Sequence, residues 1–210
     1  MKPNVPIVSI VEDDPLLARA LERLLREEGW QARSFACAED FLADHDPSAP
    51  GCVLLDVHLP GLDGLALQRR LNAQDTPASI VFLTGHGDIP MTVSAVKAGA
   101  VDFLTKPVDA AKLVATVRAA LARDRATRAQ AERSASLRQR FAALTPRERD
   151  VLDGVVAGKL NKQIAADLGI VEQTVKFHRA RIMERMQVHT VAELMHLAAR
   201  LGEAPPARGD

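Results

Sequence analysis

Aromatic residues and cysteines are scarce in this chain of 210 residues. It contains no tyrosine, one tryptophan (Trp30) and two cysteines, Cys37 and Cys52. With so few aromatic rings the chain lacks the side chains to sandwich a flavin, which argues against a flavin-binding module. The two cysteines have neither C-x-x-C nor metal-ligand spacing, so we expect no disulfide framework and no thiolate metal site.

Long apolar runs are also missing. No stretch of the sequence approaches the roughly 20 apolar residues that a membrane-spanning helix needs. The N-terminal residues lead at once into a strand-like run and contain no signal-peptide pattern. We therefore expect a cytosolic protein with no membrane partner.

The charges are balanced overall but unevenly distributed. Residues 1–122 contain 16 acidic and 11 basic residues, whereas residues 123–210 contain 11 acidic and 16 basic residues. An acidic first part is typical of a cation or regulatory site, and a basic second part favours a polyanionic partner. The sequence therefore predicts two parts with different tasks.

The first 122 residues alternate strand-like and helix-like patterns. Strand-like runs occur near 6–11, 31–35, 52–56, 80–84 and 101–105, and helical patterns lie between them. Successive βα units form parallel sheets with helices on both faces. We predict an α/β domain over residues 1–122 with a five-stranded, doubly wound parallel sheet of the flavodoxin-like type.

The remainder of the chain is predicted to be helical. Residues 123–141 are polar, rich in alanine and arginine and free of glycine and proline, as expected for a helical linker. Residues 142–201 are predicted to form a four-helix domain, which a Thr145–Glu148 capping box opens. Two of its helices flank a short turn at 169–171, the pattern of a helix-turn-helix. The tail, residues 202–210, is predicted to be disordered.

Polar side chains follow four of the predicted strands. Glu12 and Asp13 come after the first, Asp56 ends the third, Thr84 ends the fourth and Lys106 follows the fifth. The carboxyl ends of parallel strands share one edge of the sheet, so these residues should converge. This is the arrangement expected of an aspartate that accepts phosphate, with Asp56 as the acceptor.

Phosphate transfer to a carboxylate requires that the charge of both anions be neutralised. Magnesium ions prefer oxygen ligands, and Asp13, Asp56 and the backbone carbonyl of His58 could supply them, with Glu12 acting through water. Lys106 would pair with a phosphoryl oxygen or with Asp56, and a cis bond to Pro107 would aim it inward. The cofactor expected from these residues is Mg²⁺.

The first part of the chain resembles the receiver domain of a two-component response regulator. Val-Glu-Asp-Asp-Pro, Leu-Leu-Asp-Val-His-Leu-Pro-Gly-Leu-Asp-Gly, Phe-Leu-Thr-Gly-His-Gly-Asp and Asp-Phe-Leu-Thr-Lys-Pro are similar to receiver-domain motifs. The resemblance implies that Asp56 takes phosphate from a histidine kinase, that Thr84 is the switch hydroxyl and that Phe103 is the rotating aromatic residue. The stretch 84–93 resembles the FixJ subgroup. One departure is Glu12, where many members have aspartate.

The second part resembles a LuxR/NarL-type output domain. The similarity lies in Thr-Pro-Arg-Glu-Arg-Asp-Val-Leu, Asn-Lys-Gln-Ile-Ala-Ala-Asp-Leu-Gly-Ile and Gln-Thr-Val-Lys-Phe-His-Arg-Ala-Arg-Ile-Met-Glu-Arg-Met. This implies a DNA-binding helix-turn-helix that dimerises on DNA, with base contacts at Lys176, Phe177 and either Ala180 or Arg181. The full set of predicted DNA contacts is Lys162, Thr174, Lys176, Phe177, Arg179, Arg181 and Arg185.

These observations lead to one interpretation, a FixJ-type response regulator that controls transcription and is not an enzyme. Its expected partners are a sensor histidine kinase, double-stranded promoter DNA, RNA polymerase and, after phosphorylation, a second copy of the chain. Val93, Val96 and Lys97 are the predicted dimer contacts. The enzyme alternative is an aspartyl-phosphate phosphatase, which requires an acid two residues after the nucleophile as general acid and base. This chain has His58 at that position, which argues against the alternative. RNA is the alternative target, but the helix-turn-helix favours DNA.

Overall fold

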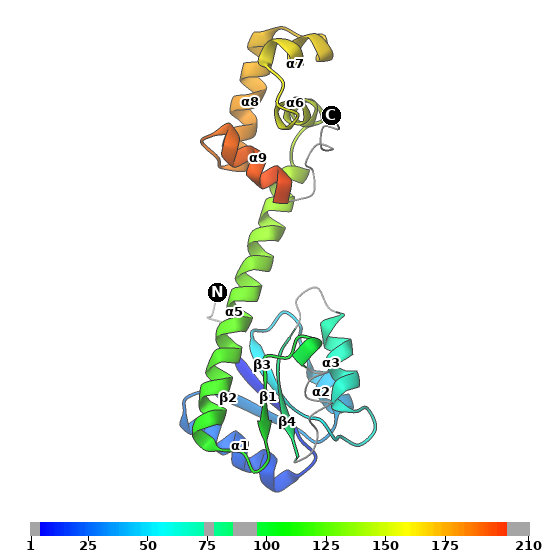
Figure 1. The fold of residues 1–210 in the computed structure, drawn as a ribbon, viewed down its shortest axis with the longest axis vertical. Coiled ribbons are helices and arrows are strands. Elements are labelled where there is room, and N and C mark those ends of the chain that lie inside the picture. The colour runs from blue at the N-terminus through cyan, green and yellow to red at the C-terminus, as the bar shows by residue number, and fades with distance from the viewer. Residues whose placement is uncertain (1–4, 74–77, 86–95, 201–210) are drawn as a thin grey trace. The chain divides into compact units, whose positions relative to one another are not determined.

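The computed structural model describes residues 5–73, 78–85 and 96–200 (Figure 1). They belong to two compact units, Met1–Ala131 and Glu132–Asp210. In the described ranges no helix combines the length and the apolar character that crossing a membrane requires. The predicted disordered tail lies outside the described residues.

The first unit contains the predicted five-stranded parallel sheet. Its strands are β1 (Ile7–Val11), β2 (Gln31–Phe35), β3 (Gly51–Asp56), β4 (Ser79–Thr84) and β5 (Asp102–Thr105). They lie in the order β2-β1-β3-β4-β5, and each neighbouring pair is parallel. The doubly wound α/β fold predicted from the sequence is confirmed. The register pairs Asp56 with Leu83 and Thr84 with Thr105, so the carboxyl ends of these strands are level.

Helices cover both faces of this sheet (Figure 1). Helices α1 (Pro15–Glu27) and α5 (Ala110–Ala142) pack on one face, and α2 (Ala38–Asp44) and α3 (Gly64–Asn72) pack on the other. Alternate β3 residues belong to different cores, with Leu54 in one and Leu55 in the other. Because both faces are buried, β3 reads as a continuous apolar run, not as an alternating one. Burial raises the pKa of the Cys52 thiol, also on β3, to about 12.

Helix α5 continues through the segment predicted as a linker, and its Asp124 is fixed to the sheet. The Asp124 carboxylate is buried, and it accepts hydrogen bonds from Gly51 N–H and from Arg128 Nε, each at 3.0 Å. Arg128 Nη1 in turn donates to the carbonyls of Pro47 and Ser48, both at 3.0 Å. These contacts, here called the Asp124–Arg128 anchor, join the start of the predicted linker to the first unit. The limits 1–122, 123–141 and 142–201 stay predictions.

The second unit consists of four short helices packed around the end of α5. They are α6 (Pro146–Val156), α7 (Asn161–Leu168), α8 (Glu172–Met186) and α9 (Val191–Arg200). Their core contains Val151, Ile164 and Ile182 together with Phe141 of α5. Gly169 ends α7 in the left-handed conformation, with φ of 63°, which glycine adopts without strain. Helices α7 and α8 therefore form the predicted helix-turn-helix.

The capping box that opens α6 is tied to α8. Glu148 Oε2 accepts from Thr145 N–H at 2.9 Å, Glu148 N–H donates to Thr145 Oγ1 at 3.2 Å, and Arg185 Nε lies 3.4 Å from Glu148 Oε1. Burial alone would raise the pKa of Glu148, but the bonds from Thr145 and the charge of Arg185 outweigh it and lower this pKa. The ionised carboxylate therefore stabilises the second unit.

Replacing Glu148 by alanine is expected to lower the free energy of unfolding of residues 132–210 by about 1–2 kcal/mol at pH 7. A depressed carboxyl pKa contributes stability above the pKa of the unfolded state, and this contribution is lost as the pH falls through the folded-state pKa. The difference between wild type and variant should therefore shrink in acid. Urea unfolding followed by circular dichroism at pH 7 and pH 3 measures it, and an equal difference at both values would contradict this account.

Candidate functional site

Four acidic and basic side chains meet at the carboxyl edge of the sheet. Glu12 and Asp13 follow β1, Asp56 ends β3 and Lys106 follows β5. One carboxylate oxygen each from Glu12, Asp13 and Asp56 lies within 4.8 Å of the others. Glu12 is 2% exposed and Asp56 5% exposed, whereas Asp13 is open to solvent. The convergence predicted from the strand ends is thus present in the structure.

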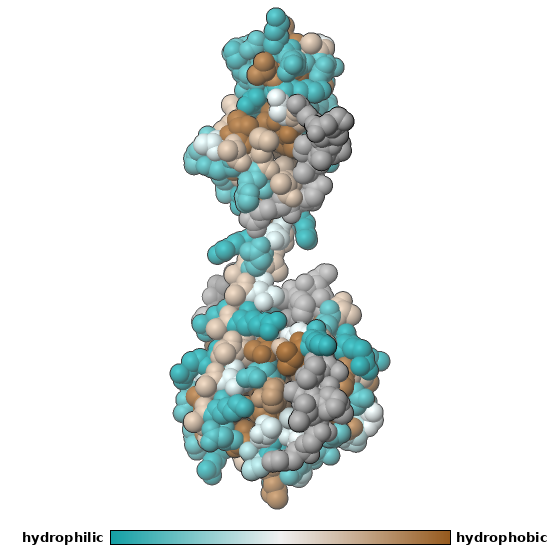
Figure 2. All heavy atoms as spheres, viewed as in Figure 1, coloured by the Kyte–Doolittle hydropathy of each residue, from teal (hydrophilic) through white to brown (hydrophobic). Residues whose placement is uncertain are grey.

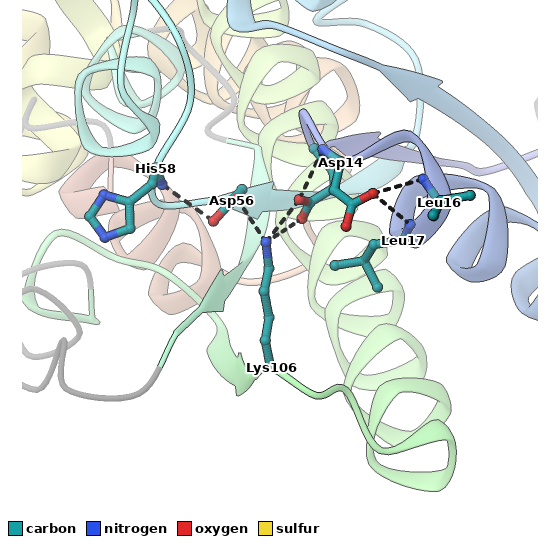
Figure 3. A network of polar contacts seen from close by, with 7 residues as sticks. Asp14, Leu16, Leu17, Asp56, His58 and Lys106 are labelled. Atoms are coloured by element: carbon teal, nitrogen blue, oxygen red, sulfur yellow. Dashed lines mark hydrogen bonds and ion pairs between the residues drawn. The ribbon is translucent and has the colours of Figure 1, made fainter.

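Asp14, which follows Glu12 and Asp13 in the sequence, serves another purpose. Asp14 is the N-cap of α1, and its Oδ1 accepts from the backbone N–H groups of Leu16 and Leu17 at 2.8 and 3.4 Å (Figure 3). Pro15 follows at the first helical position, where its fixed φ suits the start of a helix. The cap fixes the direction in which α1 leaves β1. Of the three consecutive acids, Glu12 and Asp13 therefore belong to the cluster with Asp56.

Lys106 is the positive charge of the site. Its Nζ lies 2.8 Å from Asp56 Oδ2 (Figure 3). It also lies 2.7 Å from Glu12 Oε2. Burial alone would lower the pKa of Lys106, but the hydrogen bonds to Asp56 and Glu12 outweigh it and raise this pKa. Burial raises the pKa of Glu12, against the opposing effect of Lys106. The Lys106–Pro107 peptide bond is cis, as predicted.

Of the three residues predicted to act as switches, Thr84 lies on β4, Phe103 lies on β5 and Lys106 follows β5 directly. Thr84 is buried, and its hydroxyl donates to the carbonyl of Gly85 at 3.2 Å. Its own carbonyl accepts from Lys106 N–H at 2.8 Å, which joins the two strand ends. Phe103 is half-buried, and the Nζ of Lys112 lies 5.7 Å from the centre of its ring. Thr84 and Phe103 are thus within the strands that carry the site, and the switching roles of all three residues stay predictions.

The donors at this edge fit a divalent cation. Among the described residues, the three carboxylates have one ammonium partner, Lys106, which leaves an excess of negative charge. Carboxylate oxygens are the ligands that Mg²⁺ and Ca²⁺ prefer. His58 has an exposed side chain, while its backbone N–H donates to Asp56 Oδ1 at 3.3 Å. The contribution of the His58 carbonyl to a metal site stays a prediction.

The second candidate site is the outer face of α8. Val175, Ile182 and Met186 are buried, as predicted for the inward stripe of this helix. Lys176, Phe177, Arg181 and Arg185 are exposed, as is Lys162 of α7, and Thr174 and Arg179 are half-buried. In the view of Figure 2, hydrophilic residues cover most of the end of the second unit that carries α7, with a few hydrophobic residues among them. These basic side chains thus lie at the surface of the second unit.

Two of the predicted DNA contacts also hold the second unit together. Arg179 Nη1 donates to Asn161 Oδ1 at 2.8 Å, which links α8 to the start of α7. Arg185 Nη1 donates to the carbonyl of Ala143 at 2.7 Å, in addition to its contact with Glu148. The sequence did not reveal these roles, because both partners of each contact are far apart along the chain. The phosphate contacts assigned to Arg179 and Arg185 stay predictions.

The predicted dimer contacts are only partly described. Val93 lies outside the described residues. Val96 is 46% exposed, and Lys97 beside it is also exposed at the end of a helix. An exposed valine is compatible with a contact surface but does not test it.

Comparison with known proteins identifies relatives for both units. Residues 8–118 match the family described as "Response regulator receiver domain", and residues 142–198 match "Bacterial regulatory proteins, luxR family". The chain is 43% identical to Nodulation protein W of Bradyrhizobium diazoefficiens over 93% of this chain and 86% of that protein. It is 39% identical to Transcriptional regulatory protein FixJ of Azorhizobium caulinodans, over 94% of each chain.

Solved structures agree with these sequence relatives. The response regulator StyR matches with a TM-score of 0.83 and 43% identity, over 93% of this chain and 99% of that one. Full-length FixJ from B. japonicum matches with a TM-score of 0.57 and 38% identity, over 95% of this chain and 98% of that one. The similarity therefore extends over both units.

Proposed function

Since the chain belongs to the response regulators whose receiver domain is joined to a LuxR-type DNA-binding domain, we propose that Asp56 accepts a phosphoryl group from a sensor histidine kinase. The chain is a regulator of transcription in a two-component system. The observation that carries the proposal is the level arrangement of Asp56, Glu12, Asp13 and Lys106 at one sheet edge. We further propose that this takes place in the cytosol.

In the proposed reaction an Asp56 carboxylate oxygen attacks the phosphorus of a phosphohistidine, and the imidazole leaves. Mg²⁺ held by Asp13, Asp56 and the His58 carbonyl, with Glu12 acting through water, would neutralise charge on both anions. Lys106 already contacts Asp56 at 2.8 Å, so its ammonium can follow the new negative charge onto a phosphoryl oxygen.

The proposed switch begins at Thr84. Its hydroxyl would exchange the Gly85 carbonyl, now 3.2 Å away, for a phosphoryl oxygen. Phe103 would rotate into the space that this movement leaves. Phosphorylation then shifts an existing equilibrium between two receiver conformations. The favoured conformation forms a dimer, which binds a two-fold promoter site and acts on RNA polymerase.

Phosphorylation is expected to convert the chain from monomer to dimer through Val93, Val96 and Lys97. Val96→Asp should weaken this dimer at least about tenfold, because a buried charge without a partner costs more than 1.4 kcal/mol. Sedimentation velocity with and without a phosphodonor measures the change. Val5→Asp is the matched control, since Val5 is 45% exposed and Val96 46%. A protein that binds DNA tightly while remaining monomeric at all concentrations would refute the dimer.

The DNA contacts of α7 and α8 are expected to divide into two kinds. Lys176→Ala should cost on the order of 1–3 kcal/mol on the specific site and relax its sequence preference, because Lys176 reads base edges. Lys162→Ala should weaken binding to cognate and scrambled duplexes alike and flatten the salt dependence by about one, because Lys162 contacts phosphate. Salt titrations on both duplexes separate the two. Equal losses on both duplexes for Lys176→Ala would assign the base contact to another residue.

A further inference from the structure

Large apolar side chains are exposed at the helix-turn-helix. Seven such residues are exposed in the described part of the chain, and three of them, Leu160, Val171 and Phe177, lie between residues 160 and 177. Leu160 and Val171 occupy the N-cap positions of α7 and α8, and Phe177 is in the second turn of α8. Exposed apolar residues that gather on one motif, and are not scattered singly, indicate a binding surface.

Phe177 has an unusual position for an aromatic residue. It is 59% exposed on the outer face of α8, directly after Lys176, while the apolar residues Val175 and Ile182 of the same helix are fully buried. A phenyl ring has no hydrogen-bond donor or acceptor, so it gains nothing from a phosphate group. Its contribution to binding must come from an apolar partner.

Arg181 lies against this ring one helical turn later. Its guanidinium carbon is 5.9 Å from the centre of the Phe177 ring, within the range of a cation–π contact. Arg181 Nη1 is also 3.7 Å from Glu184 Oε2, a loose contact on the exposed side of the helix. The ring therefore favours one orientation of the guanidinium and leaves its donors accessible.

The major groove of DNA offers one partner for each of these groups. The thymine 5-methyl is the apolar group on its floor, and guanine O6 and N7 accept a bidentate pair of hydrogen bonds from arginine. Residues four apart on a helix are separated by about 6 Å along its axis, or roughly two base-pair steps. We propose that Phe177 packs on a thymine methyl while Arg181, oriented by the ring, binds a guanine within about two base pairs of it. This rests on the proposed DNA binding by α8.

The test begins with duplexes selected from a random-sequence library by the phosphorylated full-length protein. Each thymine of the selected half-site is then replaced by uracil, which removes only the methyl group. At one thymine the wild type should lose about fourfold in affinity, as expected when one CH₂-sized apolar group is no longer buried (about 0.8 kcal/mol). Phe177→Ala should bind the thymine and uracil duplexes equally. Arg181→Lys keeps the charge and should lose on the order of tenfold in preference for the neighbouring guanine.

Met195→Ala is the control, because Met195 is also an exposed apolar residue of the second unit (40%) but lies on α9, outside the helix-turn-helix. It should keep the full sensitivity to uracil at the position that Phe177 reads. If Phe177→Ala, folded by circular dichroism, responds to every uracil replacement as the wild type does, the thymine contact is overturned. If Arg181→Lys keeps the guanine preference, the proposed contact between Arg181 and guanine is overturned. A library that yields no selected sequence at all would instead refute the DNA binding proposed above.

Discussion

Asp56→Asn is expected to abolish labelling of the protein by acetyl phosphate in the presence of Mg²⁺. Asparagine keeps the size of the side chain and its place at the end of β3, but its amide is not a nucleophile. The other nearby carboxylates have other proposed tasks, since Glu12 and Asp13 belong to the group that would hold Mg²⁺ and Asp14 caps α1. Intact-protein mass spectrometry should show one adduct on the wild type and none on the variant, a complete loss of the signal.

Asp14→Asn is the matched control for this experiment. Asparagine caps helices about as well as aspartate does, so α1 should keep its start and the protein its labelling. Both variants remove one negative charge from the same sheet edge, which separates nucleophilicity from general electrostatics. A labile adduct on Asp56→Asn, equal in amount to that on the wild type, would show that another residue accepts the phosphate.

Thr84→Ala and Lys106→Ala are expected to separate phosphorylation from its output. Thr84→Ala should still accept phosphate, because its hydroxyl is placed to bond a phosphoryl oxygen, not to attack it. The gain in DNA affinity on phosphorylation, expected to be roughly 5–150-fold for a coupling of 1–3 kcal/mol, should fall close to one-fold in each variant. Fluorescence anisotropy on one selected duplex, with and without phosphodonor, measures this ratio.

Thr105→Ala is the control for the loss of a hydroxyl. Thr105 is the register partner of Thr84 on β5, but its side chain is exposed. This variant should retain both labelling and the gain in DNA affinity. If Thr84→Ala and Lys106→Ala both kept the full gain, the switch would have to use other residues.

The residues at the carboxyl edge of the sheet could be predicted because short stretches of sequence identify the strands and the residues that end them. A run such as Cys52–Leu55 indicates a buried strand, and the polar residue that ends it must lie at the carboxyl edge. Parallel topology then brings Glu12, Asp56 and Lys106 together, although they are distant in the sequence. The structure adds the distances between them and the burial of Glu12, which raises its pKa.

Other contacts could not be predicted, because both partners look like solvated surface residues in the sequence. Glu148 was recognised as part of a capping box, but its pairing with Arg185 depends on how α6 packs against α8. Asp124 and Arg128 have the i,i+4 spacing of a helical ion pair, which is common on exposed helices. Their hydrogen bonds to Gly51 and to the carbonyls of Pro47 and Ser48 are tertiary contacts, which no local sequence pattern predicts.

The Asp124–Arg128 anchor bears on where such a chain can be cut or recombined. A fragment that stopped at residue 122 would deprive the Gly51 N–H, at the first residue of β3, of its acceptor. Gly51 is half-buried, so the loss should cost part of the roughly 1–3 kcal/mol that a fully buried unsatisfied N–H group costs. The same strand ends in Asp56. A gene fusion that joined this receiver to a different effector would therefore preserve the strand only if the junction fell after Arg128. The segment that such a fusion should carry therefore extends beyond residue 122, where the alternating pattern of strands and helices ends.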